Sequence, residues 1–238
     1  MPEKRLTTRT IGEPMLIHSI QLTNFLSFGE ASEAVQLRDL NVVIGLNGSG
    51  KSNLLEAFEL LSGAPKDLTK PIRDGGGIRD WLWKDSKTPA VASLEAIVRY
   101  PKGPQPLRYR LSFTEVGQRF EIVDEIIEDE RAQADKSEAD FHYKFQNGHA
   151  VLNVQDVKRR LNHEDIDPSQ SILSQRRDPD QYPEITYLGQ SLSKNSSLPR
   201  MELWALHRAS TTPEGRPTQR HVGRRLQQSW AGVESIAS

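Results

Sequence analysis

The sequence contains no cysteine, which excludes disulfide bonds, thiolate-bound zinc, iron–sulfur clusters and a cysteine nucleophile. It has no apolar run of about 18 residues and no apolar segment near its N-terminus, so it predicts neither a membrane span nor a secretory signal. Its charges nearly cancel, with 31 Lys and Arg against 32 Asp and Glu, and this balance gives no general argument for a polyanionic partner. We therefore expect a cytoplasmic protein with no membrane partner.

The 238 residues are enough for one large domain or two small ones. Residues 1–14 are polar and lack periodicity, which predicts a flexible leader. Alternating apolar residues predict a strand over 15–25, and the β-branched run at 40–44 predicts a strand buried on both faces. An amphipathic helix is expected over 53–61, and two-residue alternation over 90–154 predicts an antiparallel sheet. The fold class is therefore α/β.

One motif between the second strand and the helix carries chemistry. The segment Gly45–Asn53 reads GLNGSGKSN and satisfies the phosphate-binding pattern G-x-x-x-x-G-K-[ST], with a strand before it and a helix after it. Glycine at 48 and 50 lets successive backbone N–H groups curl around a phosphate, and the start of the helix adds its positive end. The alternative is a glycine turn that contains Lys and Ser by chance.

The side chains of this loop have separate expected roles. We predict that Lys51 bridges the β- and γ-phosphates of ATP as the catalytic cation and that the Ser52 hydroxyl binds Mg²⁺. Asn47 is expected to supply turn geometry and backbone contacts rather than side-chain chemistry. The predicted nucleotide-binding residues of the loop are Gly45, Asn47, Gly48, Ser49, Gly50, Lys51, Ser52 and Asn53.

Four segments together give a more specific likeness: LTNFLSFGE, LNVVIGLNGSGKSNLLEAFELL, IRDGGGIRDWLW and SILSQRRDPDQYPEITYL. This set resembles the first lobe of the ABC-type AAA ATPases, the class that includes RecF and the SMC head domains, over about residues 15–194. The resemblance implies a P-loop NTPase lobe with an antiparallel β subdomain and an incomplete second lobe. It also implies a homodimer that holds two ATP molecules between its heads, with DNA or a nuclease as a possible partner.

The resemblance suggests four further site residues outside the loop. It implies that Asn24, Phe25 and Ser27 lie near the nucleotide, with packing at a strand end as the alternative. It also implies that Gln175 is a catalytic glutamine touching Mg²⁺ and the attacking water, with a surface loop residue as the alternative. Two tryptophans after the glycine run, at 81 and 83, are expected to pack on one strand face rather than to stack on bases.

Hydrolysis also requires an acidic residue at the end of a buried strand. The only candidate, Asp124-Glu125, is poor because Glu121 interrupts the apolar run and because the alternation belongs to the antiparallel sheet. The acidic run 125–135 instead predicts a solvated turn or loop. In the resembling family, the second lobe carries the signature motif and this acidic strand. We therefore expect a truncated ATPase that binds ATP without hydrolysing it, with a non-hydrolysing interaction module or a remnant of a disrupted gene as alternatives.

The composition changes beyond Lys194. Residues 195–238 contain 6 Arg and 3 Glu but no Lys and no Asp. Permitted codons for 195–208 read one base later spell IRLYREWSFGRY, the kind of sequence with which members of the family continue. This leads to the hypothesis that residues 195–238 are out of frame and disordered. The rival is a genuine, divergent basic tail.

Overall fold

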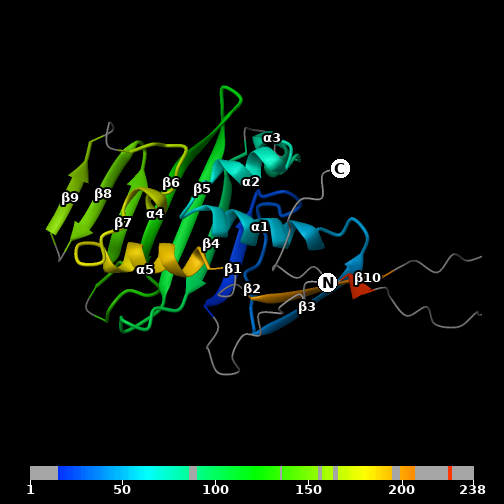
Figure 1. The fold of residues 1–238 in the computed structure, drawn as a ribbon, viewed down its shortest axis with the longest axis horizontal. Helices are drawn as coiled ribbons and strands as arrows, with labels where there is room; N and C mark the ends of the chain where they lie inside the picture. The colour runs from blue at the N-terminus through cyan, green and yellow to red at the C-terminus, as the bar shows by residue number, and fades with distance from the viewer. Residues whose placement is uncertain are drawn as a thin grey trace, which may run out of the picture.

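A computed structural model describes residues 16–85, 90–134, 136–154, 157–162, 166–194, 199–206 and 225–226. Within these residues the chain forms two sheets and five helices (Figure 1). The strands are β1 (Ile17–Thr23), β2 (Val35–Gln36), β3 (Leu40–Leu46), β4 (Ala92–Val98), β5 (Leu107–Val116), β6 (Arg119–Asp129), β7 (Phe141–Gln146), β8 (His149–Val154), β9 (Val157–Leu161), β10 (Arg200–Leu206) and β11 (Arg225–Leu226). The helices are α1 (Lys51–Gly63), α2 (Thr69–Asp74), α3 (Ile78–Trp81), α4 (Ile172–Gln175) and α5 (Pro183–Leu192).

The larger sheet has eight strands in the order β2-β1-β4-β5-β6-β7-β8-β9, and every neighbouring pair is antiparallel. Two of its hairpins close on residues with positive φ, Gly117 and Gln118 (56° and 66°) and Asn147 and Gly148 (52° and 74°). Two successive left-handed residues match the twist of paired antiparallel strands, which is why Asn-Gly favours this turn. The antiparallel sheet predicted from the alternation is confirmed.

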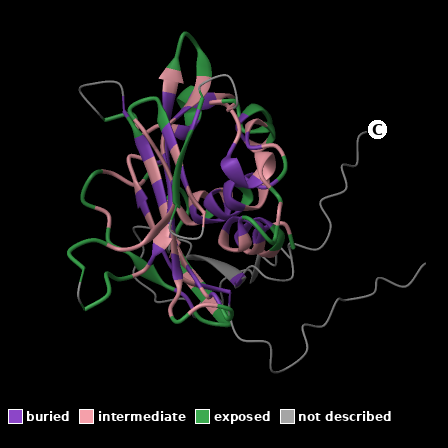
Figure 2. Ribbon diagram, turned by 90° about the vertical axis from the view of Figure 1, so that its left-hand side faces the viewer, coloured by how far each residue is buried: buried purple, intermediate pink, exposed green. Residues whose placement is uncertain are grey.

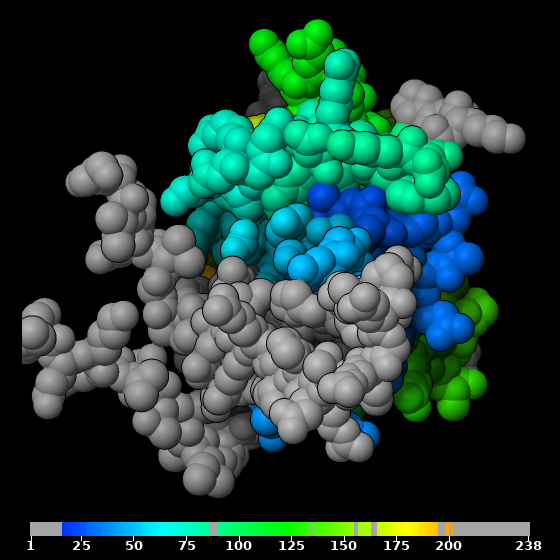
Figure 3. All heavy atoms as spheres, turned by 90° about the vertical axis from the view of Figure 1, so that its right-hand side faces the viewer, coloured from blue at the N-terminus to red at the C-terminus, as the bar shows by residue number. Residues whose placement is uncertain are grey.

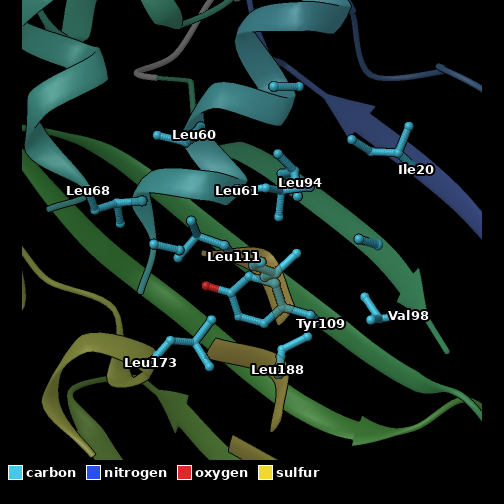
Figure 4. Packing of buried hydrophobic residues seen from close by; sticks show 14 of the residues in the cluster. Ile20, Leu60, Leu61, Leu68, Leu94, Val98, Tyr109, Leu111, Leu173 and Leu188 are labelled. Carbon is cyan, nitrogen blue, oxygen red and sulfur yellow. The ribbon is translucent and has the colours of Figure 1, made fainter. Parts of the chain in front are cut away.

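The helices lie on one side of the large sheet, and the buried residues lie between the two layers (Figure 2). Tyr109 and Leu111 of β5 face Leu60 and Leu61 of α1, and Leu188 of α5 lies in the same cluster (Figure 4). The stripe predicted on the helix is confirmed, because its four members are all buried: Leu54, Leu55, Phe58 and Leu61. α1 is therefore held firmly by its apolar face.

The first strand differs in phase from its predicted alternation. A bulge shifts the pairing of β1 with β4 between Ile17 and Ser19. Ile17 is consequently fully buried together with Ile20, although simple alternation places them on opposite faces. His18 is half-buried, and its carbonyl accepts a hydrogen bond from the Leu37 N–H at 2.8 Å.

β3, which leads into the glycine loop, belongs to a separate three-stranded sheet in the order β11-β10-β3 and pairs in parallel with β10. The prediction that this strand is buried on both faces is wrong. Leu40, Val42, Ile44 and Leu46 are 44–61% exposed, whereas the intervening Val43 packs against the core. The physical reason is that α1 contacts β3 from one side, whereas among the described residues no helix packs on the other face.

Two segments expected to be irregular contain strands. β6 continues to Asp129, so the first part of the acidic run is a strand rather than a loop. Residues 200–206 form β10 and 225–226 form β11, which corrects the expected disorder for those residues; the sequence RMELWAL has the apolar and aromatic content that suits a strand. The leader 1–14 and the other tail residues, apart from 199, lie outside the described residues. No helix of the described part is long and apolar enough to span a membrane.

Candidate nucleotide-binding site

The glycine-rich loop joins the end of β3 to the first residue of α1. Gly48 and Gly50 have positive φ angles of 80° and 81°, a backbone conformation that a residue with a Cβ rarely adopts. Gly50 is also the N-cap of α1, and no side chain caps the helix there. A Cβ at Gly50 would stand 2.3 Å from the Ser27 Oγ, so any other residue at this position would be strained in its backbone and would displace the Ser27 side chain.

Lys51 folds back over the mouth of the loop. Its ammonium group donates hydrogen bonds to the carbonyl oxygens of Gly45 at 2.9 Å and Leu46 at 2.6 Å, and to the Ser49 Oγ at 3.4 Å. These carbonyl oxygens are neutral acceptors, so a phosphate oxygen would be a stronger partner for the same ammonium group. The arrangement therefore places a positively charged group at the point where an anion would enter the loop.

The residues around the loop fit a triphosphate with a divalent cation. No side chain caps the N-terminal end of α1, and its first turn carries no acidic residue that would compete with an anion for the N–H groups there. Ser52 is exposed on that turn, so its hydroxyl is open to a metal ion. Lys51 would hold the terminal phosphates and Ser52 would bind Mg²⁺, whose role is to neutralise phosphate charge.

The turn after β1 places its three predicted residues in different surroundings. Asn53 of α1 donates a hydrogen bond from Nδ2 to the Ser27 Oγ at 2.8 Å, so Ser27 adjoins the loop. Phe25 is fully buried and packs edge-on against Trp81 and Phe113, with ring centroids 5.6 and 6.3 Å away. The expectation of a nucleotide contact is therefore wrong for Phe25, because its ring is in the core.

Asn24 has a structural role in the same turn. Its φ is 51°, and its carbonyl oxygen accepts a hydrogen bond from the Trp83 N–H at 2.9 Å. Its Nδ2 lies 3.4 Å from the carbonyl oxygen of Val91. The Leu26 N–H in turn donates to the carbonyl oxygen of Trp81 at 2.9 Å. Asn24 therefore helps to fix the segment after α3 against this turn.

The structure does not bring Gln175 to the loop. Its side chain folds onto its own segment: Oε1 accepts from the Asp167 N–H at 3.0 Å, and Nε2 donates to the Gln170 carbonyl at 2.7 Å. Gln170 in turn bonds the Leu68 N–H and Asp67, just beyond the C-terminal end of α1. Because α1 is about 20 Å long at 1.5 Å per residue, Gln175 is at the wrong end of the helix to touch Mg²⁺ or water at the loop. The predicted catalytic and metal-binding roles of Gln175 are therefore corrected.

The pair proposed as a weak acidic strand end lies in the large sheet. Asp124 forms an ion pair with Arg110 at 3.4 Å. Glu125 points into the core, where its Oε1 accepts from the Ser171 hydroxyl at 2.5 Å and the Tyr109 hydroxyl at 2.9 Å, and its Oε2 accepts from the Ile172 N–H at 2.9 Å. Burial raises the pKa of Glu125 to about 7, and these hydrogen bonds oppose the rise. The pair is structural, as the alternation implied.

A hollow of about 450 Å³ opens beside the loop. Segments near residues 25, 50 and 80 meet on this face of the molecule (Figure 3). The residues that line the hollow are Leu26, Ser27, Asn53, Asp80, Leu82, Trp83, Lys84 and Asp85. The two neighbouring tryptophans therefore differ: Trp81 is 2% exposed and packs in the core as predicted, whereas Trp83 is half-buried and forms part of the wall. Sequence reasoning missed this wall because the spacing of the tryptophans suggested a strand, while Trp81 ends a short helix and Trp83 follows it.

The AAA ATPase domain family matches residues 15–198 of the chain, which is more than half of its length. The chain belongs to the AAA ATPase domain family. No curated protein matches the sequence at a significant level. The residues of this AAA ATPase domain that meet around the loop come from the β1 turn, the start of α1 and the segment after α3.

Several solved structures resemble parts of the domain. A RecF structure with ATP, described as a recombination mediator of the RecFOR pathway, is 22% identical with a TM-score of 0.35; the match covers 48% of this chain and 27% of that one. An Smc head domain from Pyrococcus furiosus, bound to the C-terminal domain of ScpA, is 22% identical with a TM-score of 0.34, over 44% of this chain and 30% of that one. A structure from a study of ATP-driven dimerisation of SMC ATPases is 23% identical with a TM-score of 0.38, over 50% and 72%. The chain thus spans less than a third of the length of the first two, and the family assignment rests on the domain match.

Proposed function

We propose that this AAA ATPase domain binds Mg·ATP through its loop at residues 45–53, with the triphosphate on the backbone N–H groups at the start of α1. The observation that carries the proposal is the Lys51 ammonium group, held 2.9 and 2.6 Å from two carbonyl oxygens at the mouth of a loop with two left-handed glycines. A phosphate that replaces those carbonyls as partner of Lys51 gains a charge-assisted hydrogen bond. Family membership supports the same ligand.

The residues that hydrolysis would need do not lie at the loop in this structure. The acidic pair Asp124 and Glu125 lies in the large sheet, in an ion pair and in a buried network, and Gln175 is at the far end of α1. In the described residues no group of three or more His, Asp or Glu side chains could hold a metal ion by itself. A bound Mg²⁺ would therefore depend on Ser52 and on the phosphates, which is how Mg²⁺ is commonly held beside nucleotides.

Larger roles follow only by extension from the family. A cytoplasmic ATPase whose two heads close on two ATP molecules, acting on DNA or with a nuclease, remains our prediction for a complete relative. The reading-frame hypothesis remains a proposal as well. Sequencing the gene across the codons of Lys194 and Asn195 tests it. An extra base, followed by a family-like continuation in the neighbouring frame, is the expected result, and an uninterrupted frame in independent clones would remove the hypothesis.

Calorimetric titration with Mg·ATP tests the proposed binding. We expect the wild-type chain to bind, and Lys51→Ala to weaken binding about 30-fold, because a hydrogen bond to a charged group contributes about 2 kcal/mol. Lys102→Ala, which removes an exposed lysine from the turn between β4 and β5, is the matched control and should bind like wild type. Equal affinity of wild type and Lys51→Ala would contradict the proposal.

A further inference from the structure

The hollow beside the loop and the loop itself share a wall. The Ser27 Oγ lies 2.3 Å from the position that a Cβ on Gly50 would take, and it also accepts the hydrogen bond from Asn53. Both Ser27 and Asn53 line the hollow. A nucleotide whose phosphates occupy the loop therefore has the hollow immediately beside it, with room for the rest of the molecule. A volume of about 450 Å³ is within the usual range for small-molecule sites.

The hollow has one aromatic residue in its wall, Trp83, and neighbouring residues hold it in place. The Trp83 N–H bonds the Asn24 carbonyl at 2.9 Å, and Phe25 forms an isolated antiparallel bridge with Leu82. The indole of Trp83 lies so close to Gly29 that a Cβ there would be 3.2 Å from Cζ2. Backbone pairing and this close approach fix the ring, while the side chain remains partly exposed on the hollow.

We propose that the hollow receives the base of the bound nucleotide and that the Trp83 indole is the surface on which a purine ring stacks. This inference rests on the proposed binding of a triphosphate at the loop. An aromatic ring that is fixed and partly exposed loses little conformational entropy when a flat base covers it, and a purine offers the larger stacking area. The ligand class is therefore a purine nucleoside triphosphate. Inorganic tripolyphosphate has no base and would therefore bind at the loop alone.

The test compares two ligands on variants of one residue. Calorimetry measures Mg·ATP and Mg·tripolyphosphate on wild type, Trp83→Leu and Trp83→Phe. Leucine keeps bulk against Gly29 but has no aromatic face, whereas phenylalanine keeps the face. We expect Trp83→Leu to weaken the binding of ATP about tenfold, within the range of base–aromatic stacking, and to leave the affinity for tripolyphosphate unchanged. Trp83→Phe should recover most of the ATP affinity.

Emission spectra give a second readout that a purely structural role would not change. ATP should quench part of the tryptophan fluorescence of wild type, tripolyphosphate should not, and the ATP-dependent quenching should be lost in Trp83→Phe. Unchanged ATP affinity in Trp83→Leu, or an equal loss for both ligands, would overturn the stacking proposal while leaving the loop proposal intact. If wild type binds neither ligand, both proposals fail; if it binds both ligands equally well, only the stacking proposal fails.

Discussion

The two sheets of this protein are supported very differently. The eight-stranded sheet is covered on one face by helices, and its central strand β5 buries Tyr109, Leu111 and Phe113 completely. The three-stranded sheet that leads into the glycine loop exposes a row of four apolar side chains on β3. The large sheet therefore provides most of the stability. Strand β3, which leads into the proposed phosphate-binding loop, packs against α1 on one face. Binding at the loop should then be more sensitive to small local changes than the fold is.

The largest effect should come from the layer between the sheet and α1. Leu60 is fully buried there, and Leu60→Ala should lower the free energy of unfolding by about 3 kcal/mol through lost burial and a residual cavity. Urea denaturation monitored by circular dichroism measures this change. A loss below about 1 kcal/mol would mean that α1 is not anchored as described, and the contrast between the two sheets would weaken.

The buried carboxylate gives the large sheet a pH dependence. With a folded pKa of about 7 and an ordinary value of 4.5, Glu125 holds its proton more tightly in the folded than in the unfolded state. Between these two pH values the folded state binds more protons, so the free energy of unfolding should fall as pH rises from about 4.5 to about 7, by on the order of 3 kcal/mol.

The variant Glu125→Gln isolates this contribution, because an amide can occupy the same site among Tyr109, Ser171 and Ile172 without titrating. Denaturation at several pH values should show a flatter profile for Glu125→Gln than for wild type. Other carboxyl groups with a raised pKa that do not interact with Glu125, such as Glu56 and Glu59, are common to both proteins and cancel in the comparison. Identical slopes would show that Glu125 does not titrate in this range.

The glycine loop should show a smaller, local effect. Gly50→Ala introduces a Cβ at a φ of 81° and against the Ser27 Oγ, and should cost about 1–2 kcal/mol from the left-handed backbone alone. The double variant Ser27→Gly with Gly50→Ala removes the steric contact and keeps the backbone strain. Because Ser27→Gly also removes the hydrogen bond from Asn53, the cost of Gly50→Ala is measured in wild type and in Ser27→Gly. If that cost is the same in both backgrounds, the close approach of Ser27 to the loop is not as described.

The smallest effect is expected on the open face of β3. Ile44 is 61% exposed, so Ile44→Ala should change the free energy of unfolding by less than about 0.5 kcal/mol. Because contiguous exposed apolar side chains promote association, Ile44→Ser should also reduce light scattering of concentrated solutions. A loss comparable to that of Leu60→Ala would show that this face is covered in solution.

The predictions from the sequence were confirmed for the large sheet and α1 and were wrong for β3. The apolar stripe of α1 and the strand alternation of the large sheet could be predicted because each residue there faces one clear environment, buried or exposed. The same signals failed where a third element decides the environment. The β-branched run 40–44 indicated a strand with two covered faces, but the coverage of a strand depends on which elements pack beside it. The bulge in β1 and the extension of β6 to Asp129 likewise arise from pairing with distant strands.

Part of the candidate site could be predicted from the sequence, and part of it depends on the tertiary fold. The loop at 45–53 was visible in the sequence because left-handed glycines, lysine and serine have a fixed local spacing. Ser27, which the family likeness suggested, and Trp83, which it did not, come from distant parts of the chain, and the folded turn at 24–29 brings them together beside α1. Phe25 and Gln175 were assigned by family likeness, and tertiary packing places the first in the core and the second at the far end of α1.

The central claim is that a triphosphate occupies the loop between β3 and α1. A crystal structure of the chain with Mg²⁺ and a non-hydrolysable ATP analogue tests it most directly. We predict density for the phosphates against the N–H groups of residues 48–52, with the Lys51 ammonium group moved from the Gly45 and Leu46 carbonyls to a phosphate oxygen. An empty loop, with Lys51 still bonded to those carbonyls and the analogue bound elsewhere, would contradict the account.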